Sequence, residues 1–270
     1  YDQSYFVQVD DDDDVYVLGQ TAGNWTITGG RYGNPNSGQF IMKFNPALTT
    51  QQWVTTVGAG SGDIEISPTA FLVSNCKDIY LSGWGGTVNF QNSQAVTSSS
   101  NNFPVSSDAF QPTTNGSNFW IAVLSEDAAS LKYATYIGGS NSSFNHVDGG
   151  TSRFDKNGNI YFANNSGLIQ FDGSNWHKYS LPNKSEIRSL KIDALGRIFV
   201  GGNNEFGYFK TNEKGILKYY SLYNLLSPID KENINLIWRI HIFNGEVIFQ
   251  SFSKVFFLKI PKASKITKTK

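Results

Sequence analysis

Cysteine, methionine and charged residues are all scarce in this 270-residue sequence, and the scarcity of cysteine and of charge is informative. The single cysteine, Cys76, excludes a small fold held together by internal disulfides. Charged residues make up 16% of the chain, against roughly 25% in an average soluble protein. No apolar run approaches the ~18 residues of a membrane-spanning helix, so we predict no transmembrane segment. Because the chain begins at Tyr1 rather than at methionine, we expect a mature or excised fragment that has lost any export signal.

Motifs for catalysis and for cofactor binding are also missing. The sequence has no Gly-x-Ser-x-Gly nucleophile motif and no phosphate-binding loop. Its three histidines, His146, His177 and His241, lack the spacing of a zinc site. A propeller hydrolase or lyase would need paired carboxylates or a histidine-centred site, and we cannot assemble one from this sequence. We therefore predict no catalytic residues, no cofactor and a protein that is not an enzyme.

Aromatic residues and glycine are abundant, and they accompany an internal repeat. The chain has 20 phenylalanines, 13 tyrosines and 26 glycines, which favours strands and tight turns over helices. One motif occurs five times: an apolar residue, a polar turn rich in Asp, Asn or Gly, and a short strand with an aromatic residue near its start. The aromatic positions are Tyr16, Tyr80, Tyr161, Phe199 and Phe249. Each copy predicts a β-hairpin, because Asp, Asn and Gly tolerate the backbone conformations of a tight turn.

A second hairpin follows each of the first four copies, whereas only a single strand at residues 254–258 follows the fifth. Two hairpins make a four-stranded antiparallel sheet, which cannot bury both of its faces alone. The sequence therefore predicts an all-β fold, a β-propeller of about five four-stranded antiparallel blades, either closed or open as a partial ring. The N-terminal strand at residues 5–9 is a candidate for completing the last blade. A β-sandwich is the alternative, but it gives no reason for a repeated motif.

Charge and repeat length both change near the middle of the chain. Residues 1–150 contain four basic and thirteen acidic residues, a balance of −9, and residues 151–270 contain eighteen and nine, a balance of +9. This division indicates two sources of sequence or two faces with different partners. We predict propeller blades with long Ser/Thr/Asn-rich loops over residues 1–162, shorter blades over 163–260 and a basic disordered tail over 261–270. The basic residues are dispersed among aromatic strands, so we predict no nucleic-acid partner.

Two family resemblances cover different parts of the chain. Residues 6–21, 67–86 and 133–154 resemble surface and gliding-motility-associated propeller proteins of Bacteroidota that the type 9 secretion system exports. Residues 167–179, 187–202, 205–209 and 238–258 resemble the periplasmic sensor propeller of hybrid two-component regulators. These resemblances imply an extracellular, cell-surface or periplasmic location. Because one natural chain rarely mixes the two blade types, one hypothesis is a chimeric or composite chain.

The candidate site residues are few. Asp10, Asp12 and Asp14 alternate along a strand and are a weak candidate for a calcium site, since calcium prefers clustered carboxylates. The same run also fits a hairpin turn with excess charge, and we favour the turn and predict no metal. The candidate ligand-binding residues are Trp25, Trp84, His146 and Trp176, because exposed tryptophan rings can stack on sugars. Core packing is the alternative for each tryptophan, and for His146 the alternative is a turn histidine bonded to the backbone.

Three functions remain open from the sequence alone. The first is a non-catalytic binding or scaffold propeller of the cell surface or periplasm, which contacts a protein or a glycan through its blade loops. The second is a ligand-sensing domain that recognises an oligosaccharide. The third is an engineered or composite propeller with no evolved function. The expected partner is accordingly another protein or a cell-surface glycan.

Overall fold

The computed structural model describes residues 2–85, 89–91, 94–96, 99–138, 152–172, 175–213, 215–232 and 234–259. By their contacts, the residues group into two compact units. Unit 1 comprises residues 1–150, 154–159 and 172–174, and unit 2 comprises residues 151–153, 160–171 and 175–270. The predicted domain boundary at residue 162 stays a prediction, and the predicted tail at 261–270 lies outside the described residues.

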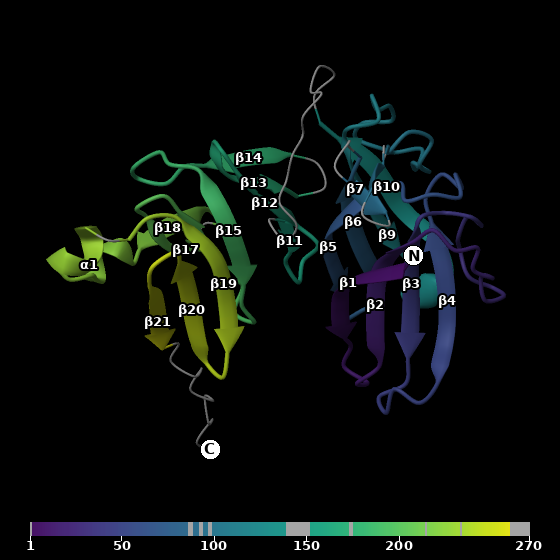
Figure 1. Cartoon of the computed structure of the whole chain (residues 1–270), viewed down its shortest axis with the longest axis horizontal. Helices are drawn as coiled ribbons and strands as arrows, with labels where there is room; N and C mark the ends of the chain where they lie inside the picture. Colours follow the sequence, from purple (N-terminus) through teal and green to yellow (C-terminus); the bar gives the residue numbers. More distant parts are fainter. Residues whose placement is uncertain are drawn as a thin grey trace. The chain divides into compact units, whose positions relative to one another are not determined.

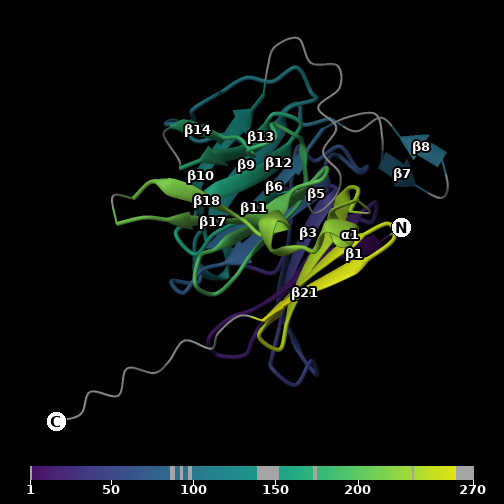
Figure 2. The ribbon, with the colours of Figure 1, turned by 90° about the vertical axis from the view of Figure 1, so that its left-hand side faces the viewer.

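The first two four-stranded sheets belong to unit 1 (Figure 1). The first sheet has the order β1 (Asp2–Val9), β2 (Val15–Thr21), β3 (Gln39–Phe44), β4 (Gln51–Val57). The second has the order β10 (Leu131–Ile137), β9 (Phe119–Leu124), β6 (Ile79–Trp84), β5 (Ser67–Val73). Within the long segment between β6 and β9, β7 (Asn89–Gln91) and β8 (Gln94–Val96) form a separate two-stranded sheet (Figure 2).

Three further sheets follow in chain order. The third has the order β11 (Ser152–Phe154), β12 (Ile160–Asn164), β13 (Gly167–Phe171), β14 (Trp176–Tyr179). The fourth has the order β15 (Ile187–Ile192), β16 (Ile198–Gly202), β17 (Phe206–Thr211), β18 (Leu217–Ser221). The fifth contains only β19 (Ile237–Phe243), β20 (Glu246–Ser251) and β21 (Val255–Lys259). The short helices are η1 (Glu126–Ala128), η2 (Tyr223–Leu225) and α1 (Pro228–Glu232).

This architecture confirms the predicted fold class, because the chain forms successive antiparallel sheets of a propeller and almost no helix. Each of the five motif copies is a hairpin between the first and second strand of a sheet. The suggestion that residues 5–9 complete the last blade is wrong. These residues lie in β1, which pairs with β2 in the first sheet. Hydrogen bonds between the described strands therefore do not close the ring.

Seven hairpin turns share one local design, which explains the polar residues of the repeat. The side chain of the first turn residue accepts a backbone N–H four or five residues later; these residues are Asp10, Asn45, Ser74, Ser125, Asp155, Asp193 and Asn212. The residue three positions after each of them has a positive φ, as expected for a hairpin turn followed by a left-handed residue. That residue is Asp13, Leu48, Lys77 or Ala128 in the first two sheets and Gly158, Gly196 or Gly215 in the third and fourth. Glycine adopts this conformation without strain, so the later turns are the less strained ones.

Each unit has its own apolar core. In unit 1 the core lies between the first two sheets and includes the fully buried Trp53 and Trp120. In unit 2 one cluster joins the third and fourth sheets around Leu190 and Phe209, and another joins the fourth and fifth around Phe199 and Phe249. Within each unit, neighbouring sheets of the repeat therefore bury the faces that they turn toward one another.

Candidate functional site

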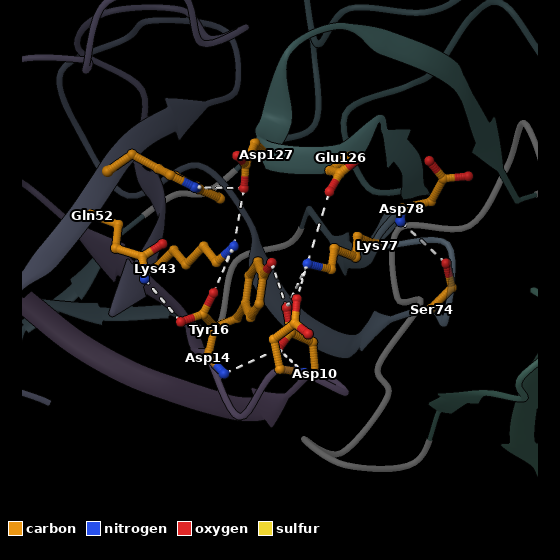
Figure 3. Close-up of polar contacts among 12 residues, drawn as sticks. Asp10, Asp14, Tyr16, Lys43, Gln52, Ser74, Lys77, Asp78, Glu126 and Asp127 are labelled. Carbon is orange, nitrogen blue, oxygen red and sulfur yellow. Dashed lines mark hydrogen bonds and ion pairs between the residues drawn. The ribbon is translucent and has the colours of Figure 1, made fainter. Parts of the chain in front are cut away.

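The acidic run of the first hairpin is a capped turn bonded to lysines (Figure 3). Asp10 accepts the backbone N–H groups of Asp12 and Asp14 through Oδ1, at 3.0 Å each. The Lys77 ammonium contacts the Asp12 carboxylate, and Lys43 Nζ lies 3.0 Å from Asp14 Oδ2. Asp12 and Asp14 thus face different lysines instead of converging on one point. Within the described part of the chain, no three His, Cys, Asp or Glu residues are grouped as for a metal ion.

Lys43 extends this network to the second sheet of unit 1. Its Nζ also lies 3.2 Å from Oδ1 of Asp127, and the indole N–H of Trp53 donates to the same oxygen at 3.1 Å. Burial acts to lower the pKa of Lys43, but its contacts with Tyr16, Asp14 and Asp127 raise the pKa overall. The network is a structural tie between the two sheets, and its lysines neutralise the carboxylates locally.

A second buried carboxylate belongs to Glu65, in the loop that precedes β5. Glu65 Oε2 accepts the N–H of Gly38 at 2.9 Å, and Oε1 accepts the N–H groups of Ala59 and Ser61 at 3.0 Å. Burial raises the pKa of Glu65, against the opposing effect of these backbone donors. A Cβ atom on Gly58 would lie 2.0 Å from Glu65 Oε2. Both carboxylate oxygens of Glu65 accept backbone N–H groups, and Gly58 fills the space beside them. The role of Glu65 is therefore to fix the conformation of this loop.

The predicted ligand-binding residues lie in different environments. Trp25 is half-buried in the loop after β2 and stacks on Phe40, with ring centroids 4.6 Å apart. Trp84, at the end of β6, is buried, with only 6% of its surface exposed. Trp176 in β14 packs on Phe171, with ring centroids 4.8 Å apart, and is partly exposed. His146 lies outside the described residues. The role of these four residues in ligand binding stays a prediction.

The fifth sheet exposes apolar residues that the sequence interpretation did not single out. The third strands of the other sheets, β3, β9, β13 and β17, are mostly buried. No described strand pairs with the outer edge of β21 (Figure 1). Within β21, Val255, Phe257 and Lys259 are exposed and alternate with half-buried Phe256 and Leu258. The only signal in the sequence was that a single strand, rather than a hairpin, follows the fifth motif.

We define the outward face of the fifth sheet as the face that points away from the fourth sheet. The strand register places Phe257 beside Ile248, and Ile248 beside His241. Its apolar residues are Phe243, Ile248, Val255 and Phe257, with Arg239 and Lys259 among the exposed charges. Phe243 and Phe257 are about two-thirds exposed, at 66% and 64%. Clustered apolar side chains of this kind mark interaction surfaces more often than isolated ones do.

Comparison with known proteins shows similarity only at the level of three-dimensional structure. No family model and no curated protein matches the sequence. Virginiamycin B lyase from Staphylococcus aureus is a similar structure, with 13% identity, a TM-score of 0.44 and coverage of 96% of this chain and 71% of that one. A gluconolactonase-like protein has 8% identity, a TM-score of 0.44 and coverage of 95% and 73%. The resemblances to gliding-motility-associated and sensor propellers stay predictions.

These structures correct one prediction. The sequence interpretation concluded that the chain is not an enzyme, whereas the two similar structures are named for a lyase and a gluconolactonase. These names contradict the prediction that the chain is not an enzyme, and at 8–13% identity the likeness itself shows the fold alone. The prediction rested on the absence of familiar motifs, and one fold can carry active sites of unrelated kinds.

None of the described helices has the length and hydropathy needed to cross a membrane.

Proposed function

We propose that this protein is a protein-binding module, and that its partner adds a β-strand along the free edge of β21. The observation that supports the proposal is that the fifth sheet has three strands among the described residues, whereas each of the other four propeller sheets has four. The outer edge of a sheet presents unpaired backbone N–H and C=O groups, which are a template for another strand.

The exposed side chains distinguish β21 from the other outer strands. Natural outer strands resist unwanted pairing by carrying lysine or other polar residues. Here Gln52, Lys132, Lys178 and Lys218 occupy exposed positions on β4, β10, β14 and β18, respectively. In β21 the exposed positions are Val255, Phe257 and Lys259, and two of these three are apolar. We infer that this edge is suited to pairing.

The fourth sheet indicates what the added strand would look like. Its fourth strand, β18, buries Leu217 and partly buries Tyr219, while Lys218 and Tyr220 are exposed. A strand added to β21 would likewise place apolar residues over Phe256 and Leu258 and polar residues beside Lys259. Because residues 151–270 carry an excess of nine positive charges, the favoured polar residues are acidic. The proposed partner is an extended segment that alternates apolar with acidic residues.

The proposed setting is the cell surface or the periplasm. The sequence favours this setting through its low charge, its Ser/Thr/Asn-rich loops and its resemblance to surface and sensor propellers. A partner in the same setting would be a surface or periplasmic protein with an accessible acidic segment.

A labelled peptide of about ten residues that alternates valine with aspartate tests the proposal. We expect a saturable rise in its fluorescence anisotropy with the full chain. The same peptide, N-methylated along one edge, cannot donate the inter-strand hydrogen bonds and should not bind. Lys259→Glu should weaken binding about tenfold, or 1.4 kcal/mol. The matched substitution Lys218→Glu, on the edge of the fourth sheet, should leave binding unchanged.

Equal binding of the N-methylated peptide would show that backbone pairing is not the mode of recognition. Equal weakening by Lys259→Glu and Lys218→Glu would show that the peptide follows the general positive charge of residues 151–270. Either result overturns the proposal.

A further inference from the structure

The first sheet also has an apolar face, on the side opposite to the face that packs on the second sheet. In its strand register, Val7 pairs with Val17 and Val17 with Met42, while Val9 pairs with Val15 and Val15 with Phe44. Paired residues of neighbouring strands lie on one face, and these six side chains are all apolar. Val7 and Val9 are exposed, and the other four are half-buried. The opposite face, with Tyr16, Leu18 and Ile41, is buried against the second sheet.

A sheet that faces water on one side normally alternates apolar with polar residues, so that its wet face is polar. The outward faces of the first and fifth sheets both depart from this rule. Phe243, Ile248, Val255 and Phe257 are the apolar residues of the fifth-sheet face. The first-sheet face therefore has the composition of a sheet face that packs on another sheet. The fifth-sheet face combines its apolar residues with polar ones, which are Arg239, His241, Glu246, Gln250 and Lys259.

The exposed charges beside the two faces are opposite in sign, while half-buried Glu246 of the fifth-sheet face pairs in register with Lys259. Exposed Asp11 and Asp13 lie in the turn that joins Val9 to Val15 on the first sheet. Exposed Arg239 and Lys259 lie on the outward face of the fifth sheet. The surrounding sequence follows the same division, with −9 over residues 1–150 and +9 over residues 151–270.

From this complementarity we infer that the chain associates head to tail with further copies of itself. The outward face of the first sheet in one copy packs on the outward face of the fifth sheet in the next. This inference goes beyond the proposed function, because it uses the sheet faces and leaves the edge of β21 available to a partner strand. Like-with-like packing of two first sheets is disfavoured, since it would bring their acidic turns together.

Two different faces make a heterologous interface, which repeats until a ring closes or a filament forms. Apolar packing supplies the attraction, and the charges on either side fix which faces meet. Exposed charges are screened over about 8 Å at physiological salt. The association should therefore weaken, without vanishing, as salt is raised.

Sedimentation velocity of the full chain over a range of concentrations tests this inference. We expect the average mass to at least double over about a hundredfold rise in concentration, in line with micromolar affinity. Val7→Asp, on the first sheet, and Phe257→Asp, on the fifth, should each be monomeric. An equimolar mixture of the two variants should form a species of two chains and nothing larger, since only one pair of intact faces remains. Leu48→Asp, at an exposed turn position, should assemble like the parent chain.

Circular dichroism of each variant separates a lost interface from a lost fold, and the substituted side chains are exposed in the monomer. A parent chain that stays monomeric at every concentration overturns the inference. So does association of Val7→Asp alone, which would mean that fifth sheets pair with each other. If the valine–aspartate peptide still binds to a monomeric chain, the proposed function stands and only self-association fails. If neither occurs, both fail.

Discussion

In unit 2, β17 is the third strand of the fourth sheet and β21 is the third strand of the fifth sheet. The two strands occupy equivalent positions in neighbouring sheets but have opposite environments. Phe209 of β17 is 2% exposed and lies between the rings of Tyr179 and Tyr219. Phe257 of β21 is 64% exposed. Both strands are rich in phenylalanine, so their own composition does not set this difference. It arises because Tyr179 of the third sheet and Tyr219 of β18 enclose Phe209, whereas Phe257 lies on the outward face of the fifth sheet and no described strand follows β21.

Replacing each of these two phenylalanines with alanine is the test of this comparison with the largest expected effect on stability. Phe209→Ala should lower the free energy of unfolding by about 3–5 kcal/mol, because it leaves a cavity among buried rings. Phe257→Ala should change it by less than about 0.5 kcal/mol, since its ring is largely in water. Urea unfolding followed by tryptophan fluorescence measures both values. Similar losses for the two variants would mean that β21 is covered in solution.

The residues that precede the two strands provide the second test. Glu205, just before β17, is buried, and its Oε1 accepts hydrogen bonds from the hydroxyls of Tyr219 and Ser221 on β18, at 3.0 and 2.8 Å. Glu205→Ala should cost about 2–3 kcal/mol, because it leaves buried hydroxyl groups unpaired.

Lys254 is the matched control, just before β21. Its ion pair with Asp230 is partly exposed, with side-chain exposures of 30% and 40%, and ion pairs at the surface contribute little. Lys254→Ala should barely change the urea midpoint. A loss as large as that of Glu205→Ala would contradict the distinction between a strand fixed in its sheet and a free outer strand.

The third and smallest expected effect is a loss of stability at alkaline pH that is caused by Tyr219 of β18. Burial, followed by the nearby Glu205 carboxylate, raises the pKa of the Tyr219 phenol well above 10. A folded-state pKa above the unfolded one means that the folded chain holds this proton more tightly. The contribution of this proton to the free energy of unfolding is therefore complete below pH 10 and is lost as pH rises beyond 10.

Tyr219→Phe should cost about 1 kcal/mol at neutral pH, through the lost hydrogen bond. It should also flatten the alkaline fall in stability between pH 10 and 11. Urea midpoints measured across this range for the parent chain and the variant provide the comparison. An unchanged alkaline slope would show that Tyr219 does not hold its proton as the structure implies.

The strands were predictable because the repeat contains both halves of each hairpin. The polar residue that begins each turn, such as Asp10 or Asp193, recurs because its side chain fixes the turn. The three described strands of the last sheet were predictable too, since the sequence predicts a single strand, at residues 254–258, after the fifth motif. Alternation within a strand shows which residues share a face.

The site was less predictable, because exposure depends on what lies beside a strand. Trp84 and Phe257 are both aromatic strand residues, yet only Phe257 is well exposed. Long-range contacts were equally hidden: nothing near Lys43 in the sequence reveals that Asp127 lies 3.2 Å from it. The choice between core packing and sugar stacking for Trp84 and the conclusion that the chain is not an enzyme both relied on local sequence where distant contacts decide.

Amide hydrogen exchange of β21 tests the central claim most directly, with β17 as the internal reference. In the free chain, the β21 amides that do not pair with β20 should exchange at least about tenfold faster than those of β17. Saturating valine–aspartate peptide should slow the β21 amides and leave β17 unchanged, and the N-methylated peptide should alter neither strand. Slow exchange of β21 in the free chain, with no response to the peptide, would contradict strand addition at this edge.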